Sequence, residues 1–264
     1  MGDNEALKTY RAKRHFDRTK EPSGDGAQQP GGERTREPHG QDRPSGEAPG
    51  DEPRFVVQIH DARRMHFDFR LEVDGVLKSW SVPKGPSNDP QDKRLAVPTE
   101  DHPLEYLDFE GVIPKGEYGG GTVIVWDRGT YRPLNHDRRG RPVQMDEALR
   151  RGHVRFWLNG EKLRGGYALT RFRGGEGDPE DEAWLLVKTD DARAHNGDHG
   201  PSAPRRARSV LSGRTLRQVA ESEEPDGSRV GDVRGEADEP GTVRTRTRSG
   251  TRTTLANPRR SRRT

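Results

Sequence analysis

The stretch HDARRMHFDFRLE, residues 60–72, alternates polar and apolar side chains from His66 onward. Successive side chains of a β-strand project to opposite faces, so His66, Asp68 and Arg70 share one face. The apolar residues between them lie on the other face. The alternation therefore predicts a strand with one apolar face and one unusually polar face.

The preceding stretch FVVQIH, residues 55–60, alternates in the same way and places His60 on its polar face. The residues DARRM form a plausible loop between the two strands, which would bring both imidazoles together. Two histidines and a carboxylate suit a divalent transition metal such as manganese, iron or zinc. The alternative is a polar strand face wetted by solvent, which is common. The number and type of ligands at His60, His66 and Asp68 favour the metal site.

Other polar residues could complete such a site. Arg70 either pairs with a neighbouring carboxylate or clamps a phosphate or carboxylate beside the metal. His102 and Tyr106 follow in EDHPLEY, and KRLAV carries Arg94. The glycine-rich GEYGGGT, residues 116–122, lacks the lysine of a phosphate-binding loop and precedes a strand, so it predicts a hairpin turn.

Composition limits how much of the chain can fold. Only 27% of the 264 residues are hydrophobic and 34% are charged, whereas a globular chain carries close to half apolar residues. We therefore expect one folded domain with disordered flanks. The predicted organisation is a basic N-terminal arm, a disordered Pro- and Gly-rich linker, a β-barrel domain and a disordered tail, at residues 1–21, 22–53, 54–190 and 191–264.

The core region contains mainly strand patterns. Seven stretches alternate or carry β-branched and aromatic residues: FVVQIH, HFDFRLEV, LKSWSV, RLAV, GTVIVWDRGTY, VRFWLNGEKLRGGYALTRF and AWLLVKT. Asp74-Gly75 and Asn159-Gly160 are hairpin signals, and MDEALRR predicts one short helix closed by Gly152. This pattern indicates a mainly β fold, a small antiparallel barrel or sandwich, and we predict the barrel.

Several classes of protein are disfavoured. Cysteine is absent, which excludes disulfides and thiolate metal ligands and fits a reducing compartment. No apolar run approaches a membrane span, and the N-terminal residues lack the apolar segment of a signal peptide. We expect a monomeric cytoplasmic protein with no membrane association.

The tail has patterned charge. Residues 221–239 hold eight acidic residues and two arginines, whereas residues 244–263 hold eight arginines and no acidic residue. The arginine-rich block is either a sequence-independent anchor for the DNA backbone or part of a solubilising tail that folds back on the acidic block. Upstream, SVLSGRTLRQVAE could form a brief helix capped by Ser212 or Thr215.

The core resembles a known family. The stretches FVVQIHDARRMHFDFRLEVDGVLKSWSVPKGPS and KRLAVPTEDHPLEYLDFEGVIPKGEYGGGTVIVWDRGTY, and then FWLNGEKLRGGYALTR and WLLVKTDD, are similar to the 3′-phosphoesterase module of bacterial DNA ligase D. In that family the domain uses manganese to remove a 3′-terminal ribonucleotide or a 3′-phosphate from a DNA primer. The resemblance implies a nucleoid-associated enzyme of break repair by non-homologous end joining. Its substrates would be DNA or RNA–DNA primer-template 3′ ends.

The resemblance also implies residue roles. The manganese ligands would be His60, His66 and Asp68. Arg70 and His102 would hold the scissile phosphate, with Tyr106 assisting phosphomonoester hydrolysis. The metal would neutralise a phosphate oxygen and help generate a water nucleophile, and His102 could be an electrostatic stabiliser or a general acid.

Further implied residues support the site. Arg94 and Glu100 match supporting residues of the family, and the N-terminal stretch YRAKRHFDRTKEP matches an arm that reaches into catalysis. In this arm Arg14 and Glu21 match, but His15 stands where the family has an aspartate. An imidazole cannot supply a fixed negative charge, so the contribution of the arm is open. The family module is usually fused to polymerase and ligase domains, whereas this sequence contains neither. We therefore expect a stand-alone version that serves a separate DNA ligase and polymerase.

Two other functions compete with this one. His66-x-Asp68 with a distal histidine also resembles the iron ligands of a β-barrel oxygenase, for which His153 followed by Arg164 is the candidate pair. A non-catalytic protein that binds DNA ends, with a structural metal, is the third hypothesis. Turnover without oxygen and phosphate release from a 3′-phosphorylated primer would separate the three.

Overall fold

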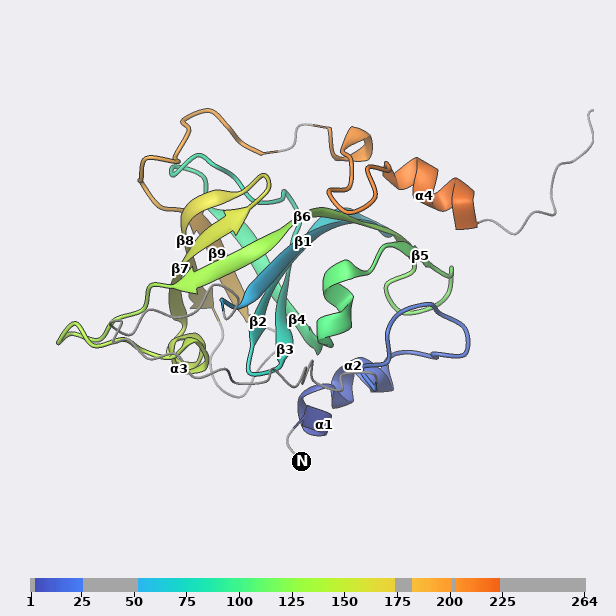
Figure 1. Ribbon diagram of the computed structural model, residues 1–264, viewed down its shortest axis with the longest axis horizontal. Helices are drawn as coiled ribbons and strands as arrows, with labels where there is room; N and C mark the ends of the chain where they lie inside the picture. Colours follow the sequence, from blue (N-terminus) through green and yellow to red (C-terminus); the bar gives the residue numbers. More distant parts are fainter. Residues whose placement is uncertain (1–2, 26–51, 174–181, 201–202, 224–264) are drawn as a thin grey trace, which may run out of the picture. The chain divides into compact units, whose positions relative to one another are not determined.

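Eight strands close into an antiparallel barrel in the computed structural model, which describes residues 3–25, 52–173, 182–200 and 203–223 (Figure 1). The middle of the predicted linker and all of the arginine-rich block lie outside the described residues. The strand order is β1-β2-β3-β4-β9-β8-β7-β6-β5, and β1 also pairs with β6, which closes the ring and leaves β5 beyond it. The strands are β1 (Arg54–Asp61), β2 (Met65–Val73), β3 (Val76–Val82), β4 (Arg94–His102), β5 (Gly111–Ile113), β6 (Gly121–Pro133), β7 (His153–Gly160), β8 (Arg164–Arg173) and β9 (Ala183–Lys188). The predicted mainly β barrel is confirmed.

Helices are few and short, but there are more than the one predicted. The helix expected from MDEALRR is α3 (Met145–Arg150), and Gly152 after it has the predicted left-handed conformation, with φ +78°. The others are α1 (Asp3–Ala6), α2 (Lys8–Ala12), α4 (Leu216–Glu223) and the 3₁₀ turns η1 (Leu104–Asp108) and η3 (Pro204–Arg206). Among the described residues, no helix combines the length and the apolar character needed to cross a membrane.

The interior of the barrel is apolar. One cluster of buried side chains, the interior cluster, receives residues from each of the eight barrel strands. On β2 its members are Phe67, Phe69, Leu71 and Val73, which continue the apolar half of the alternation in the opening stretch. Burying each such side chain contributes roughly 1.5–3 kcal/mol, so this face supplies much of the stability of the fold.

The outer face of β1, β2 and β3 is covered as well. A second set of buried side chains, the outer cluster, joins Val56 of β1 and Leu77 of β3 to Tyr106 of η1 and Tyr10 of α2. α2 contacts β4, and η1 contacts β3 and β6 (Figure 1). The polar residues of β2 therefore face a covered space rather than a wetted surface.

Both predicted hairpins are present, but their turns differ. Asp74-Gly75 joins β2 to β3 with φ +50° and +79°, as predicted for a two-residue turn. Asn159-Gly160 instead ends β7, because Asn159 pairs with Arg164 and the turn falls on the residues between them. The Asp127 carboxylate holds this later turn by accepting hydrogen bonds from three consecutive backbone N–H groups, those of Glu161, Lys162 and Leu163.

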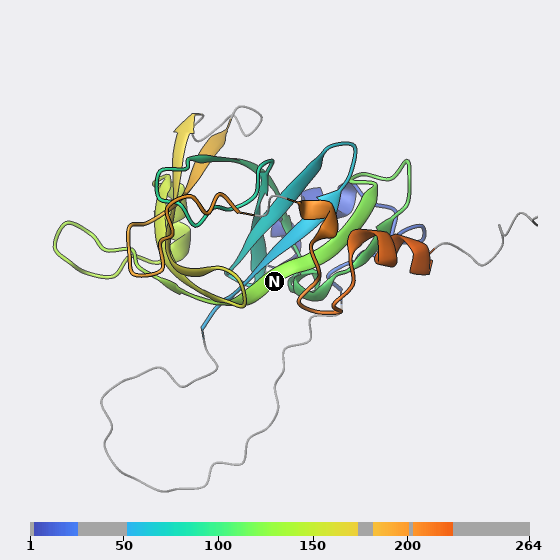
Figure 2. The same ribbon diagram turned by 90° about the horizontal axis from the view of Figure 1, so that it is seen from above.

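The predicted domain boundary at residue 190 is too early. Thr215 caps α4 through a reciprocal pair of hydrogen bonds with Gln218, a capping box that supports one of the two predicted caps. Leu216 and Val219 of α4 are buried, and the helix lies against β5 and β6 (Figures 1 and 2). Two apolar side chains three residues apart form one helix face, so α4 gains burial by docking on the barrel. The segment around it is folded, in contrast to the predicted disordered tail.

Candidate active site

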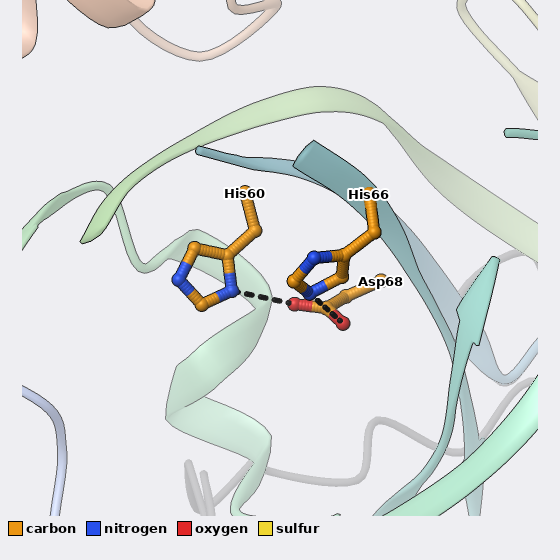
Figure 3. A group of neighbouring side chains, drawn as sticks. All are labelled: His60, His66 and Asp68. Carbon is orange, nitrogen blue, oxygen red and sulfur yellow. Dashed lines mark ion pairs between the residues drawn. The ribbon is translucent and has the colours of Figure 1, made fainter. Parts of the chain in front are cut away.

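The β1–β2 hairpin assembles the three predicted metal ligands. His60 lies directly opposite His66 in the strand register, and their ring centroids are 4.8 Å apart. Both rings turn toward Asp68, two residues further along β2 (Figure 3). His60 Nδ1 lies 3.5 Å from one Asp68 oxygen, and His66 Nε2 lies 3.4 Å from the other. One atom from each residue, all within 4.8 Å of one another, could hold a metal ion.

Backbone carbonyls set the orientation of both imidazoles. His60 Nε2 lies 2.7 Å from the carbonyl oxygen of Gly119, and His66 Nδ1 lies 2.9 Å from that of Arg64. A carbonyl only accepts, so the outer nitrogen of each ring carries a hydrogen and the inner nitrogen of each ring faces Asp68. Two inner nitrogens and a carboxylate that converge in this way fit a divalent cation, and anchoring of the outer nitrogen is typical of metal-bound histidine.

Asp68 is ionised despite its burial. Burial alone would raise the pKa of Asp68, but the Arg70 guanidinium, with Nη2 3.1 Å from the carboxylate, holds that pKa well below its usual range. Burial lowers the pKa of His66, whereas the adjacent Asp68 carboxylate outweighs burial and raises it. The site thus keeps one fixed negative charge between the two rings.

Arg70 is held rigidly by residues that the sequence analysis did not single out. Its Nε donates to Gln58 Oε1 at 2.9 Å, and its Nη1 donates to Ser79 Oγ at 2.8 Å. Gln58 in turn donates to the carbonyls of Tyr106 and Phe109, which ties the strand to η1 and the residue after it. Gln58 precedes His60 by two residues in FVVQIH, and the same alternation places it on the polar face, although its role was not predicted.

His102 is a neutral hydrogen-bond acceptor in this structure. Its Nδ1 lies 2.8 Å from the carbonyl of Glu100, so the proton resides there and Nε2 faces Arg14 Nη2 at 3.3 Å. Burial and the positive charges of Arg70 and Arg14 lower the pKa of His102 well below its usual value. In this state Nε2 has no proton to donate to a leaving group.

The N-terminal arm forms one wall of the site. Arg14 lies 2.8 Å from both Glu21 and Glu100, and Tyr106 donates its hydroxyl hydrogen to Glu21 at 2.8 Å. The Tyr10 ring lies 3.8 Å from the Arg14 guanidinium and packs edge-on against His102. The structure thus brings the predicted residues of the arm to the predicted residues of η1 and β4.

His15 points away from this network. Its side chain is 66% exposed, and its Nδ1 lies 2.9 Å from Glu117, which also pairs with Arg18 at 3.2 Å. Glu117 belongs to the turn between β5 and β6, residues 114–120, here called the glycine loop. The position where the family has an aspartate therefore contacts this loop rather than the buried carboxylates.

The glycine loop is the turn predicted from GEYGGGT. Backbone hydrogen bonds from Glu117 to Pro114 and from Gly120 to Glu117 form two successive turns before β6. Gly121 follows against the backbone of Asp61, where an added Cβ would collide with the Asp61 carbonyl. The close approach lets the loop place its Gly119 carbonyl on His60.

Arg94 is the one predicted site residue that the structure keeps apart. It pairs in register with Leu186, a member of the interior cluster, and donates to Asp92 at 2.8 Å and to the His199 carbonyl at 2.6 Å. β4 is irregular between Thr99 and His102, where two residues, Glu100 and Asp101, lie opposite the single residue Lys78 of β3. A bulge of this kind changes which residues face outward, so Arg94, which the resemblance implied, does not share a face with His102.

The residues around the ligands line a cavity of about 1310 Å³. Arg14, Arg70, Glu100, His102 and Tyr106 line it together with the three ligands and the glycine loop. His153 and Arg164, required by the oxygenase hypothesis, lie at opposite ends of the β7–β8 ladder and do not line this cavity. That hypothesis therefore lacks its distal ligand, His153.

The fold and the site define a small antiparallel barrel that carries a preorganised group of two histidines and an aspartate beside buried arginines. Residues 58–171 match the family model of the DNA ligase D 3′-phosphoesterase domain. The chain therefore carries a domain of this family, as the resemblance of its motifs predicted.

Known relatives extend the match. Over 218 residues, 82% of this chain, it is 46% identical to the multifunctional non-homologous end joining protein LigD of Pseudomonas aeruginosa. Over 125 residues, 47% of this chain, it is 49% identical to the multifunctional non-homologous end joining DNA repair protein LigD of Mycobacterium tuberculosis. The matched parts span 22% and 15% of those two proteins.

Proposed function

We propose that this protein is a metal-dependent phosphoesterase that processes DNA 3′ ends during non-homologous end joining. It removes 3′-terminal ribonucleotides and 3′-phosphates and leaves a 3′-hydroxyl. The family match and the names of the relatives support a role at DNA ends. The observation that carries the proposal is the convergence of two imidazole nitrogens and the Asp68 carboxylate beside Arg70.

The metal would be held by His60, His66 and Asp68, and we propose manganese, with other divalent transition metals as substitutes. Mixed nitrogen and oxygen donors suit such ions better than magnesium, which prefers oxygen ligands. When bound, the ion would neutralise a phosphate oxygen and lower the pKa of a water molecule. Gly119 and Arg64 orient the two rings for this role through their carbonyls.

Arg70 and Arg14 would bind the phosphate. The three hydrogen bonds of Arg70 use one hydrogen on each of its nitrogens, so both Nη atoms keep one for a phosphate oxygen. The buried, fixed guanidinium stabilises negative charge that develops beside it. His102 would gain its Nε2 proton when a phosphate dianion enters, because that charge offsets the two arginines.

Tyr106 acts as a positioning residue. Burial and the nearby Glu21 raise the pKa of Tyr106 well above its usual value, so the phenol stays protonated. Its hydroxyl and Arg14 Nε share one Glu21 oxygen, each at 2.8 Å. Tyr106 therefore fixes Glu21, and Glu21 fixes the guanidinium that faces His102.

The test is a matrix of metals and substrates. Primer-templates that end in one ribonucleotide or in a 3′-phosphate are incubated with manganese, zinc, magnesium or a chelator, in air and under anaerobic conditions. We expect both 3′ ends to be converted to 3′-hydroxyls with manganese, equally without oxygen, and no conversion with chelator. Absence of product under every condition, with DNA still bound, would instead identify a non-catalytic end-binding protein.

A 3′-hydroxyl is what a polymerase extends and a ligase seals. We therefore propose that a DNA ligase and a polymerase of the end-joining system consume the product. Mixing the treated primer-template with such a ligase tests this step, because only an end with a 3′-hydroxyl can be joined.

A further inference from the structure

Three exposed cations line the cavity without an acidic partner. They are Arg63 and Arg64 in the turn between β1 and β2, and Lys115 in the glycine loop. Among the described residues, no hydrogen bond or ion pair is made by any of their side chains. We call these three residues the rim cations.

Each acidic residue that lines the cavity already has a partner other than the rim cations. They pair with other cations or belong to the ligand group: Asp61 with Arg205, Glu100 with Arg14, Glu117 with Arg18, and Asp68 with Arg70. The rim cations therefore contribute positive charge that no neighbouring carboxylate cancels. Such charge attracts an anion to the mouth of the cavity.

The rim cations sit on the two loops that orient the histidines. The turn that carries Arg63 and Arg64 supplies the carbonyl that holds His66, and the glycine loop with Lys115 supplies the one that holds His60. Their backbone positions are thus fixed relative to the ligand group. Both loops line the cavity, so a polymer whose end lies at the ligands has these cations within the cavity that holds its end.

We propose that the rim cations bind the phosphodiester backbone of the DNA strand immediately upstream of its 3′ end. This inference rests on the proposed function, because it takes a 3′ end as the occupant of the site. Lysine and arginine contacts to phosphates position a nucleic acid without selecting its sequence. A phosphate at each of several successive nucleotides then adds affinity that a mononucleotide lacks.

The experiment compares Arg63→Ala/Arg64→Ala with Arg138→Ala/Arg139→Ala in the full chain. The second pair is also two adjacent exposed arginines in a loop, but it does not line this cavity. Binding of a fluorescent primer-template is measured by anisotropy over a salt series. We expect the negative slope of the logarithm of the binding constant against the logarithm of the salt concentration to become shallower by about one to two units in the rim variant. The control should keep the wild-type slope.

A second measurement uses catalysis. We expect the ratio of kcat/KM for a 3′-phosphorylated primer-template to that for a 3′-phosphorylated dinucleotide to fall about tenfold in the rim variant. Arg63→Lys/Arg64→Lys, which retains both charges, should restore the slope and the ratio, and Lys115→Ala should lower both more weakly. Substitution of Arg64 leaves its carbonyl on His66.

Two outcomes would overturn the inference. One is a salt slope in the rim variant equal to that of the wild type, and the other is an equal loss in the control variant. Binding can be measured without turnover, so a protein that binds DNA through the rim cations but releases no product would refute the proposed function alone.

Discussion

At the centre of β2 both faces are buried, but they are chemically opposite. Phe69 on the inward face is 0% exposed and Arg70 on the outward face is 2% exposed. The inward side chains pack in the apolar interior cluster, whereas each outward group has a hydrogen-bond or ionic partner. A buried polar group is tolerated when its partners are fixed, so the outward face is organised for binding and the inward face for stability.

The strongest test of this contrast is His66→Ala. Loss of one ligand from the Asp68 site should lower phosphoesterase activity by at least about 10³-fold, since a metal supplies several kcal/mol to such reactions. We expect the free energy of unfolding in chelator to change by about 1 kcal/mol or less, because Asp68 keeps its pair with Arg70. Full manganese-dependent activity in this variant would show that the ligand assignment is incorrect.

The converse test is Phe69→Ala. Phe69 packs against Phe55 and Phe156 inside the barrel, so its truncation should lower the free energy of unfolding by about 3–5 kcal/mol. Denaturant unfolding measures this loss, and Phe172→Ala is the control because Phe172 is 55% exposed on β8. Similar losses for both variants would remove the contrast between the faces.

A variant in the N-terminal arm, Glu21→Gln, tests whether the residues that cover the outward face also contribute stability. Glu21 is fully buried and accepts hydrogen bonds from Arg14, Tyr106 and Thr19. Glu21→Gln should lower the free energy of unfolding by about 2 kcal/mol, because charge-assisted hydrogen bonds are replaced by weaker ones and one donor faces an amide N–H. Glu5→Gln, exposed in the same arm, should cause no measurable change. An unchanged stability of Glu21→Gln would mean that the arm is not docked in solution.

The pH dependence of stability isolates His102. Its folded-state pKa lies below the unfolded value of 6.5, so the folded protein binds fewer protons at this group and loses stability as the pH falls below about 6.5. This loss reaches at most about 1.4 kcal/mol per pH unit. The raised pKa of His66 acts in the opposite sense, with stability that is present below pH 6.5 and lost as the pH rises through its folded-state value.

The variant His102→Asn removes only the first of these two contributions. Between pH 6.5 and 5.5 its free energy of unfolding in chelator should therefore fall less steeply than that of the wild type. The free energy of unfolding is measured by denaturant titration at each pH. If it falls equally steeply in the variant and the wild type, His102 is not buried as a neutral imidazole.

Period-two alternation was sufficient to predict the hairpin, the barrel interior and the shared face of His66, Asp68 and Arg70. It could not place Arg94, because the bulge in β4 depends on how that strand pairs with β3. The same alternation places Gln58 on the polar face, but an isolated glutamine does not suggest chemistry, so its role in holding Arg70 was not predicted. The docking of α4 could not be predicted, because its buried face consists of only two apolar residues, Leu216 and Val219, in a polar segment.

The smallest expected effect concerns His15. Because its side chain is largely exposed and contacts Glu117, His15→Asp would set a second carboxylate beside that of Glu117 rather than extend the buried network of Arg14. Surface ion pairs contribute about 0–1 kcal/mol, so we expect activity to fall by a factor of about five or less, with Arg18 still holding Glu117. His15→Ala is the matched control, because it removes the same contact without adding a charge. The rate of 3′-phosphate release measures both effects. A large gain in this rate in His15→Asp but not in His15→Ala would mean that the arm reaches the substrate from this position.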